Sequence, residues 1–362
     1  MSGGRDLGRW ADRLWAAATA GDEQAAAGVA RDALDAGVDM ESLLLDVVGA
    51  VQARVGAEWA ANRISVTQEH VVTAVNERVI AALADDPRAR RREGPARGRL
   101  AVACVDGEWH ALPARLLADV LRLRGWTVDY LGAQVPTPHL VSYLHRTGPD
   151  AIALSSSIAT RLPAAHAAIA ACRATGTPVL VGGAAYGPGG RYARLLGADA
   201  WAPDARAAAD LLARGLPRRP PAPPQASGHL PHLDDQEYTL LTRSAADLVR
   251  ELMDELERRH PEVARYTPRQ RQATAEDLAH VVEFLAASLY VDDPELFSGF
   301  LTWTAGILTA RDVPTGFLLS ALDLLARRLT GLPRATGVLA HAREVLCGAL
   351  VPAPVPGRGK PE

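Results

Sequence analysis

Two places in the chain set a carboxylate beside an imidazole. Glu108 stands two residues before His110, and Glu69 directly precedes His70. A carboxylate can hold one ring nitrogen of a histidine and make the other a better metal ligand. The first pair therefore predicts metal ligation, although a loop histidine can also be simply solvated. The second pair follows Trp59 after nine residues, and these three side chains are either solvated surface or the roof over a ligand.

Small and polar residues follow two later apolar runs. The stretch "LSSS" contains Ser155, Ser156 and Ser157, and "VGGAAYG" contains Gly182 and Gly183. Hydroxyl groups and glycines leave room for a ligand and offer it hydrogen bonds. Together they predict a deep, narrow slot that offers hydrogen-bond donors and contains no large side chains.

These loops belong to a segment that alternates apolar runs with helix-like stretches. The runs are "RLAVACV", "WTVDYLG", "AIALSS", "PVLVGG" and "ADAWAPD". Short apolar strands alternating with helices are typical of a doubly wound, parallel-sheet (Rossmann-like) α/β domain, here predicted over 98–215. In such sheets the ligand lies beyond the carboxyl ends of the strands, where the loops above are placed.

The flanking segments are helical by pattern, so the fold class is multidomain α and α/β. Residues 1–85 carry apolar stripes at helical spacing and predict a four-helix bundle, and residues 234–350 predict an all-α domain. Charged residues with Pro and Gly breaks predict a linker over 85–99. Proline-rich stretches predict a stiff linker over 216–233 and a tail over 351–362.

Composition restricts the class of protein. The 362 residues have a formal net charge of -3, with 48% hydrophobic and 22% charged residues. This balance argues against a general nucleic-acid or membrane-surface binder. The three cysteines are far apart, and the start of the chain has no apolar signal core. We therefore expect no disulfide framework, no membrane partner and a cytoplasmic location.

The middle segment resembles the cobalamin-binding domain of methionine synthase, several mutases and light-sensing regulators. The shared elements are Glu108-Trp109-His110, "YLGAQVP", the serine loop and the Gly-Gly loop, in that order. The resemblance implies that His110 is the lower axial cobalt ligand and that the nucleotide tail lies between the serine and glycine loops. Glu108 replaces the usual Asp, and Pro113 stands where Gly is usual, which could alter the loop that admits the tail.

The helical segment before it resembles the cap of the light-sensing members, which carries a tryptophan, nine residues and then Glu-His. The resemblance implies that Trp59 and Val66 enclose the adenosyl group of adenosylcobalamin, with Glu69 and His70 beside it. In light-dependent repressors of this type a histidine directly after the tryptophan can take the upper cobalt site after photolysis. Here that position is Ala60, so His70 or water would have to substitute.

The last segment resembles globin-like sensor domains, and the combination resembles photocobilins, receptors that pair cobalamin with biliverdin. Arginines would bind the propionates, polar groups would face the pyrroles and aromatic residues would form walls, although each also has a simple structural reading. The bilin candidates are Tyr266, Arg269, Arg271, Asp277, His280, Tyr290, Phe297, Trp303 and Arg311. Cys347 is either a covalent attachment point or, as we expect, a buried free thiol.

The resemblance implies a photoreceptor rather than an enzyme. We expect a homo-oligomer whose association depends on light, an effector domain or protein downstream, and no direct nucleic-acid partner. One alternative is a corrinoid protein that carries methyl groups for a methyltransferase. Another is a cobalamin protein whose last domain senses haem or only dimerises.

Overall fold

The protein is described here from a computed structural model. It describes residues 3–89, 97–216, 229–261 and 263–350. The described chain forms two compact units, Met1–His229 and Leu230–Glu362. Three predicted segments lie wholly or partly outside the described residues. They are residues 90–96 of the charged linker, residues 217–228 of the proline-rich linker and the tail 351–362.

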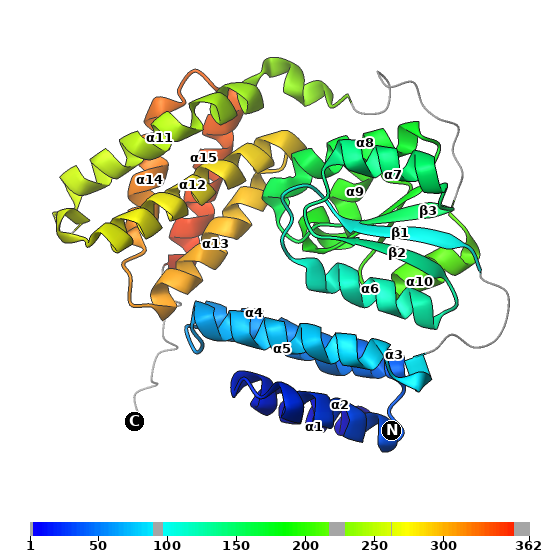
Figure 1. The fold of residues 1–362 in the computed structure, drawn as a ribbon. Helices are drawn as coiled ribbons and strands as arrows, with labels where there is room; N and C mark the ends of the chain where they lie inside the picture. The colour runs from blue at the N-terminus through cyan, green and yellow to red at the C-terminus, as the bar shows by residue number, and fades with distance from the viewer. Residues whose placement is uncertain (1–2, 90–96, 217–228, 262, 351–362) are drawn as a thin grey trace, which may run out of the picture. The chain divides into compact units, whose positions relative to one another are not determined.

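The first unit begins with the predicted bundle of four helices (Figure 1). The helices are α1 (Gly3–Thr19), α2 (Glu23–Asp35), a continuous third helix made of α3 (Met40–Ser42), η1 (Leu43–Val48) and α4 (Gly49–Ala60), and α5 (Val66–Ala84). Their apolar stripes meet in one core. Side chains cap the helix starts: Asp22 accepts from the backbone N–H of Ala25, and Asp39 accepts from that of Ser42.

A π-helical turn interrupts the third helix. Residues Leu43–Val48 adopt it, and four of the six, Leu43, Leu44, Val47 and Val48, are buried in the bundle core. Such turns inside α-helices often mark functional sites. Here the turn directly precedes α4, the helix that contains Trp59.

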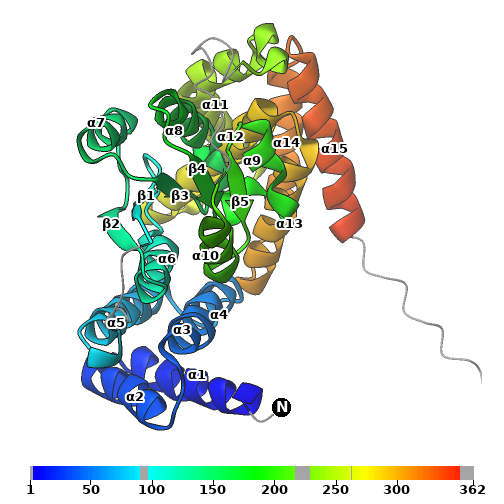
Figure 2. The same ribbon diagram turned by 90° about the vertical axis from the view of Figure 1, so that its right-hand side faces the viewer.

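All five predicted strands form one parallel sheet. They are β1 (Arg99–Cys104), β2 (Thr127–Gly132), β3 (Ala151–Ser155), β4 (Val179–Gly182) and β5 (Ala200–Ala202), in the order β2-β1-β3-β4-β5. The helices between and after them are α6 (Ala111–Leu123), α7 (Thr137–Thr147), α8 (Leu162–Ala174), α9 (Arg191–Leu195) and α10 (Ala205–Arg214). Helices α6 and α10 cover one face of the sheet and α7 and α8 the other, as Figures 1 and 2 show.

The strand order places the predicted site. Strand β1 pairs with β2 on one side and β3 on the other, so the chain reverses its direction of winding between β1 and β3. Ligands of doubly wound sheets bind at this point. The loop after β1 contains Glu108 and His110, and the loop after β3 contains Ser156 and Ser157.

An ion-pair cluster joins the bundle to the α/β domain, and we call it the clasp. Arg124, at the end of α6, donates to Glu41 at 2.8 and 2.9 Å and also pairs with Asp210. Arg206, on α10, donates to Asp46 at 2.6 and 2.9 Å. Two bidentate arginines therefore fix the α3–η1 segment against α6 and α10.

The second unit contains helices and no strand among its described residues, in line with the predicted all-α domain. Its long helices are α11 (Glu237–Arg259), α12 (Pro268–Val291), α13 (Pro294–Ala310), α14 (Gly316–Arg328) and α15 (Pro333–Leu350). They share one apolar core, with Phe297 and Leu325 fully buried. Among the described residues, no helix has the length and apolarity needed to cross a membrane. The globin-like character of this unit stays a prediction.

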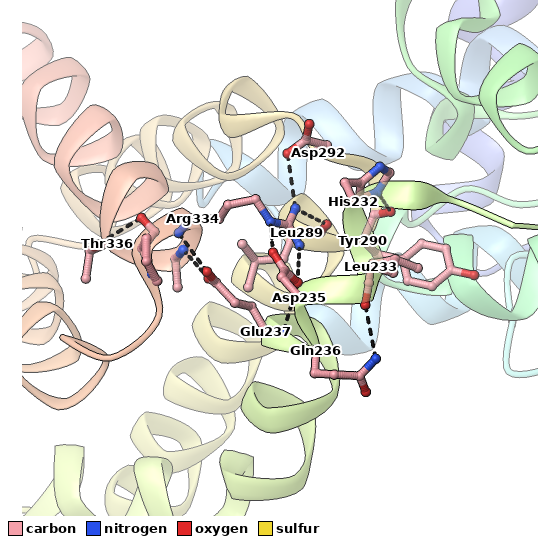
Figure 3. Close-up of polar contacts among 12 residues, drawn as sticks. His232, Leu233, Asp235, Gln236, Glu237, Leu289, Tyr290, Asp292, Arg334 and Thr336 are labelled. Atoms are coloured by element: carbon pink, nitrogen blue, oxygen red, sulfur yellow. Dashed lines mark hydrogen bonds and ion pairs between the residues drawn. The ribbon is translucent and has the colours of Figure 1, made fainter.

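Arg334 and Glu237 join three helices of this unit (Figure 3). The guanidinium of Arg334 donates to Asp235 at 2.5 and 3.1 Å, to Asp292 at 3.0 Å and to the carbonyl of Leu289 at 3.0 Å. The carboxylate of Glu237, only 3% exposed, accepts from the backbone N–H groups of Arg334 and Ala335 at 2.9 and 2.8 Å. A carboxylate at a helix start satisfies its free N–H groups and the positive end of its dipole.

Candidate functional site

The loop after β1 is organised around the buried carboxylate of Glu108. Its side chain is 1% exposed and accepts hydrogen bonds from the backbone N–H groups of His110 (2.9 Å), Ser157 (2.5 Å) and Ile158 (3.2 Å). Burial alone would raise the pKa of Glu108. The hydrogen bonds from His110 and Ser157 outweigh burial and lower that pKa to about 2. Glu108 therefore stays ionised and ties the β1 loop to the serine loop.

His110 is held through one ring nitrogen. Its Nδ1 lies 2.6 Å from Oε1 of Glu108, and its side chain stays half exposed. The hydrogen bond to Glu108 raises the pKa of His110, and the charge of Glu69 adds to this effect. Because Nδ1 is committed to Glu108, Nε2 is the nitrogen with which His110 can ligate a metal.

A cavity of about 120 Å³, called the slot below, lies at the ends of β3 and β4 beside α6 and α10. It is lined mainly by small residues, including Ala153, Ser155, Gly182 and Gly183. Gly183 has a φ of +106°, and a Cβ there would lie 2.1 Å from the carbonyl oxygen of Ser156. Only glycine allows the two loops to approach this closely. Pro113 also lines the slot, at the position where the resemblance expects glycine.

A larger cavity of about 700 Å³ lies between the bundle and the α/β domain. The bundle contributes Trp59, Val66, Glu69 and His70, and the α/β domain contributes Trp109, His110 and Ser157, so the structure brings the two predicted groups together. Trp109 is 70% exposed, so its indole is available to a ligand in this space. The cavity therefore offers apolar walls and two imidazoles to one ligand.

The start of α5 presents the cap residues to this cavity. Ser65 and Gln68 form a capping box that begins the helix at Val66. Val66, Glu69, His70, Thr73 and Glu77 follow at helical spacing, and all five line the cavity. Side chains separated by three or four residues share one helix face. The same spacing could have identified Thr73 and Glu77 from the sequence, where they were missed.

A chain of hydrogen bonds leads from Glu69 into the bundle. Thr73 Oγ1 donates to Glu69 at 3.1 Å, and Gln52 Nε2 donates to Thr73 at 2.9 Å. Asn76 Nδ2 donates to Gln52 at 2.9 Å, and Asn76 is completely buried. These polar residues join α4 to α5, so a ligand that contacts Glu69 is connected to the packing of the two helices.

The remaining serines have separate roles. Ser156 is buried, and its hydroxyl donates to Glu108 at 3.4 Å. Ser155 lines the slot, whereas Ser157 lines the larger cavity. The serine loop thus contacts both spaces.

The second unit contains a cavity of about 80 Å³ at which some of the bilin candidates meet. Tyr266 and Asp277 line it together with Thr304 and Phe317. Thr304 was missed by sequence reasoning, and its Oγ1 is buried without a hydrogen-bond partner among the described residues. Desolvation raises the pKa of Asp277, while the charges of His280 and Arg311 act in the opposite direction. Asp277, His280 and Arg311 therefore form one electrostatic group.

The other bilin candidates lie apart from this cavity. Tyr290 packs edge-on against Tyr238 at 4.9 Å, Trp303 is 52% exposed, and Phe297 belongs to the core. Arg269 is exposed, and Arg271 pairs with Glu257 at 2.5 Å.

The cysteines form no disulfide in the part of the chain that the structure describes. Cys104 and Cys172 are buried free thiols. Cys347 is also a free thiol, but it is only partly buried. The expectation that this thiol is buried was therefore wrong, because a residue near the end of α15 keeps one side in solvent.

Comparison with known proteins relates the residues around these cavities to B12-binding domains. Residues 98–212 match a B12 binding domain, and residues 10–84 match a second B12 binding domain model. The chain is 30% identical over 182 residues to the HTH-type transcriptional repressor CarH of Myxococcus xanthus, covering 49% of this chain and 58% of the repressor. It is 27% identical over 143 residues to trimethylamine corrinoid protein 1 of Methanosarcina acetivorans, covering 39% of this chain and 65% of that protein.

The chain thus spans less than two thirds of the length of these curated relatives. A solved structure, the monomethylamine corrinoid protein of Methanosarcina barkeri, is similar with 20% identity and a TM-score of 0.49, covering 56% of this chain and 95% of that one. The matches of residues 10–84 and 98–212 to B12 binding domain models indicate a corrinoid as the cofactor.

Proposed function

We propose that this protein is an adenosylcobalamin-dependent photoreceptor, with biliverdin as a second chromophore in the helical unit. The observation that carries the proposal is the cavity in which Trp59 and Glu69 of the bundle share one space with His110. A carrier of small methyl groups does not require a bundle surface of this size and polarity over the cavity. The similarity to a repressor over 182 residues supports the same choice.

The donor set fits a metal whose other ligands come from a macrocycle. Within the described ranges, no group of three or more His, Cys, Asp or Glu side chains could hold a bare metal ion. His110 supplies a single imidazole, oriented by Glu108. His110 would hold the cobalt of a bound corrinoid through its Nε2 atom. The slot beside Gly183 supplies room for the nucleotide tail.

Adenosylcobalamin supplies a cobalt–carbon bond that visible light breaks. The residues of the bundle then have a clear role in the dark. Trp59 and Val66 provide apolar surface for the adenosyl group, and Glu69 can accept hydrogen bonds from its ribose or adenine. These contacts exclude water from the upper side of the cavity and hold α4 and α5 in place.

Loss of the adenosyl group would remove those contacts from Glu69. Since Glu69 is hydrogen-bonded to Thr73, and Thr73 to Gln52, the change reaches the α4–α5 interface directly. The clasp at Arg124 and Arg206 holds the other end of the third helix. The bundle can therefore move at the cavity while it stays attached at the clasp, and such a movement can change subunit association.

The test is illumination of the adenosylcobalamin-loaded full chain, followed by absorption spectroscopy and sizing by light scattering. We expect a spectral change and a change in mass in the wild type. A sample that keeps both its spectrum and its mass under light contradicts the proposal. The dark-kept sample, handled identically, is the control.

A corrinoid methyl carrier is the second candidate, because relatives named as trimethylamine corrinoid proteins match at 23–27% identity. This function predicts loading with methylcobalamin and a methyltransferase partner. Replacement of Trp59 by Ala separates the two candidates. A methyl carrier keeps its function in that variant, whereas a photoreceptor loses its adenosyl cap.

The bilin proposal is supported by the group formed by Asp277, His280 and Arg311, which combines acid, imidazole and cation near an apolar cavity. That cavity, at about 80 Å³, is smaller than the roughly 300–1,000 Å³ of ligand sites. A bilin there requires the surrounding helices to separate. Addition of biliverdin or haem to the apoprotein, followed by absorption spectroscopy, distinguishes a bilin sensor from a haem sensor.

A further inference from the structure

Glu77 on α5 lines the cavity between the bundle and the α/β domain, and its side chain is exposed there. The other three titratable side chains of this cavity are already engaged. Glu69 accepts a hydrogen bond from Thr73 at 3.1 Å and contacts His70. His110 lies 2.6 Å from its own carboxylate partner. Within the described residues Glu77 takes part in no hydrogen bond or ion pair, so its carboxylate is open to a bound molecule.

Glu77 lies away from the residues that we propose to enclose the adenosyl group. Val66 and Glu69 belong to the first turn of α5, and Trp59 precedes that turn at the end of α4. Glu77 follows Glu69 by eight residues, which corresponds to about 12 Å along a helix axis. A corrin ring is wider than its axial group and carries carboxamide side chains around its edge. In the proposed binding mode, Glu77 is therefore placed to meet the edge of the ring.

The charge of Glu77 also acts on the α/β domain. Burial raises the pKa of Tyr130, on β2, to about 12, and the charge of Glu77 acts in the same direction. Arg115, on α6, acts in the opposite direction, and its guanidinium lies 5.7 Å from the centroid of the Tyr130 ring. This arginine is paired with Asp119 at 2.9 Å. Because no ion pair offsets Glu77 within the described residues, a second negative group at this end of the cavity would be repelled.

We infer that Glu77 makes the cavity selective for corrinoids that carry an uncharged carboxamide, rather than a carboxylate, at the ring edge that meets α5. A carboxamide N–H donates to the carboxylate of Glu77, and a hydrogen bond to a charged acceptor is a strong one. A carboxylate in the same place has no hydrogen to donate and carries the same charge. Repulsion of a nearly identical ligand is a common source of specificity. The inference rests on the proposal that the cavity binds cobalamin, and it adds a specificity to that proposal.

Hydroxocobalamin and its monocarboxylates, in each of which one ring amide has been hydrolysed to an acid, test the inference in the dark. Each isomer is titrated separately into the apoprotein, and the absorption spectrum of the corrinoid reports binding. We expect the isomer whose acid meets Glu77 to bind about 10- to 100-fold more weakly than hydroxocobalamin, the range that a hydrogen bond to a charged group implies. Salt at about 1 M should reduce this difference, because it screens the repulsion.

Glu77→Gln removes the charge and keeps the length of the side chain. Its amide can donate to a carboxylate, so the affinity for the disfavoured isomer should rise to that for the other isomers. Glu23→Gln is the matched control, because Glu23 lines a separate hollow between α2 and α5 and pairs with Arg78 at 2.6 Å. This variant removes the same charge from the bundle and should discriminate as the wild type does. Circular dichroism of each apoprotein verifies folding.

The inference and the proposed function fail separately. Equal binding of hydroxocobalamin and every monocarboxylate by the wild type would overturn the inference, as would a difference that Glu77→Gln leaves unchanged. In both cases the cavity still binds a corrinoid, and the photoreceptor proposal depends on its own light test. Selective binding without a response of the adenosylcobalamin form to light would support the inference and contradict the photoreceptor proposal. Failure of the wild type to bind any of these corrinoids would overturn both.

Discussion

Glu69 on α5 and His110 after β1 line one cavity, and the charge of Glu69 reinforces the effect of the Glu108 hydrogen bond in raising the pKa of His110. The two residues belong to different domains and lie 41 positions apart in the sequence. Their proximity means that a group bound between them contacts the bundle and the sheet at once. The first two predictions concern this coupling.

Trp59→Ala should weaken binding of adenosylcobalamin on the order of 10- to 100-fold, because the variant loses the apolar surface of an indole. Binding of hydroxocobalamin should change much less, since it has no adenosyl group to cover. Equilibrium titration with each cobalamin measures the two affinities. Trp303→Ala, which removes an exposed indole of the helical unit, is the control. Equal losses for both cobalamins would show that Trp59 does not cap the adenosyl group.

Thr73→Val removes the hydroxyl that joins Glu69 to Gln52 while it keeps the volume of the side chain. We expect the free energy of unfolding of the first unit to fall by about 1–3 kcal/mol, because partners are left unsatisfied. We also expect a smaller light-induced change in mass. Denaturant titration and sizing provide the measurements. Thr73→Ser keeps the hydroxyl, so a defect as large in this variant would exclude the hydrogen-bond chain as the cause.

Gly183→Ala should abolish corrinoid binding and strongly destabilise the first unit, since its Cβ would lie 2.1 Å from the carbonyl oxygen of Ser156. Gly176→Ala is the comparison, because Gly176 also has a positive φ, +83°, but a Cβ there meets no atom within 4 Å. It should cost only about 1–2 kcal/mol. Thermal unfolding and titration with hydroxocobalamin compare the two variants. Similar losses would show that positive φ, rather than the approach to Ser156, explains the glycine.

Arg334→Ala should destabilise the helical unit by about 1–3 kcal/mol, because it leaves Asp235, Asp292 and the carbonyl of Leu289 without their shared donor. Arg343→Ala removes an exposed ion pair with Asp323 in the same unit. That pair should contribute no more than about 1 kcal/mol. Unfolding in denaturant, followed by helical circular dichroism, gives both values. A smaller effect at Arg334 than at Arg343 would contradict the role assigned to Arg334.

Asp277→Asn tests the pH dependence of the helical unit. Desolvation raises the pKa of Asp277 in the folded protein, so its ionised form is less favourable there than in the unfolded chain. The stability that protonated Asp277 contributes is present below the unfolded pKa of about 3.9 and is lost as the pH rises through the folded pKa. The difference in melting temperature between Asp277→Asn and the wild type should therefore shift in favour of the variant as the pH rises from about 4 to about 7. Asp254→Asn, at an exposed position of α11, should show no such trend.

The sheet, and the part of the candidate site that the α/β domain contributes, could be predicted from the sequence. Buried parallel strands are continuous apolar runs, so the five strands were visible without any tertiary information. Their carboxyl ends then place His110, Ser155 and Gly183 at one edge of the sheet. Ser155, Gly182 and Gly183 line the slot at this edge.

The polar interior of the bundle could not be predicted in the same way. Gln52 and Asn76 lie on different helices, and whether they meet depends on how α4 and α5 are rotated against one another. In the helical unit, an aromatic residue at helical spacing can be core, as Phe297 is, or exposed, as Trp303 is. The sequence pattern is the same for both, which explains why the predicted bilin residues do not all gather at one cavity.

The π-helical turn at Leu43–Val48 has a consequence for the phase of the third helix. A wider turn holds more residues than an α-helical turn, so it sets the direction in which every later side chain of that helix points. Deleting one residue within 43–48 would rotate Gln52, Val55 and Trp59 by about 100° around the helix axis. A deletion that spares Asp46 would keep the clasp residues, but the indole of Trp59 would face away from the cavity. The π-helical turn, which contains Asp46 thirteen residues before Trp59, thus determines whether the indole of Trp59 faces the cavity.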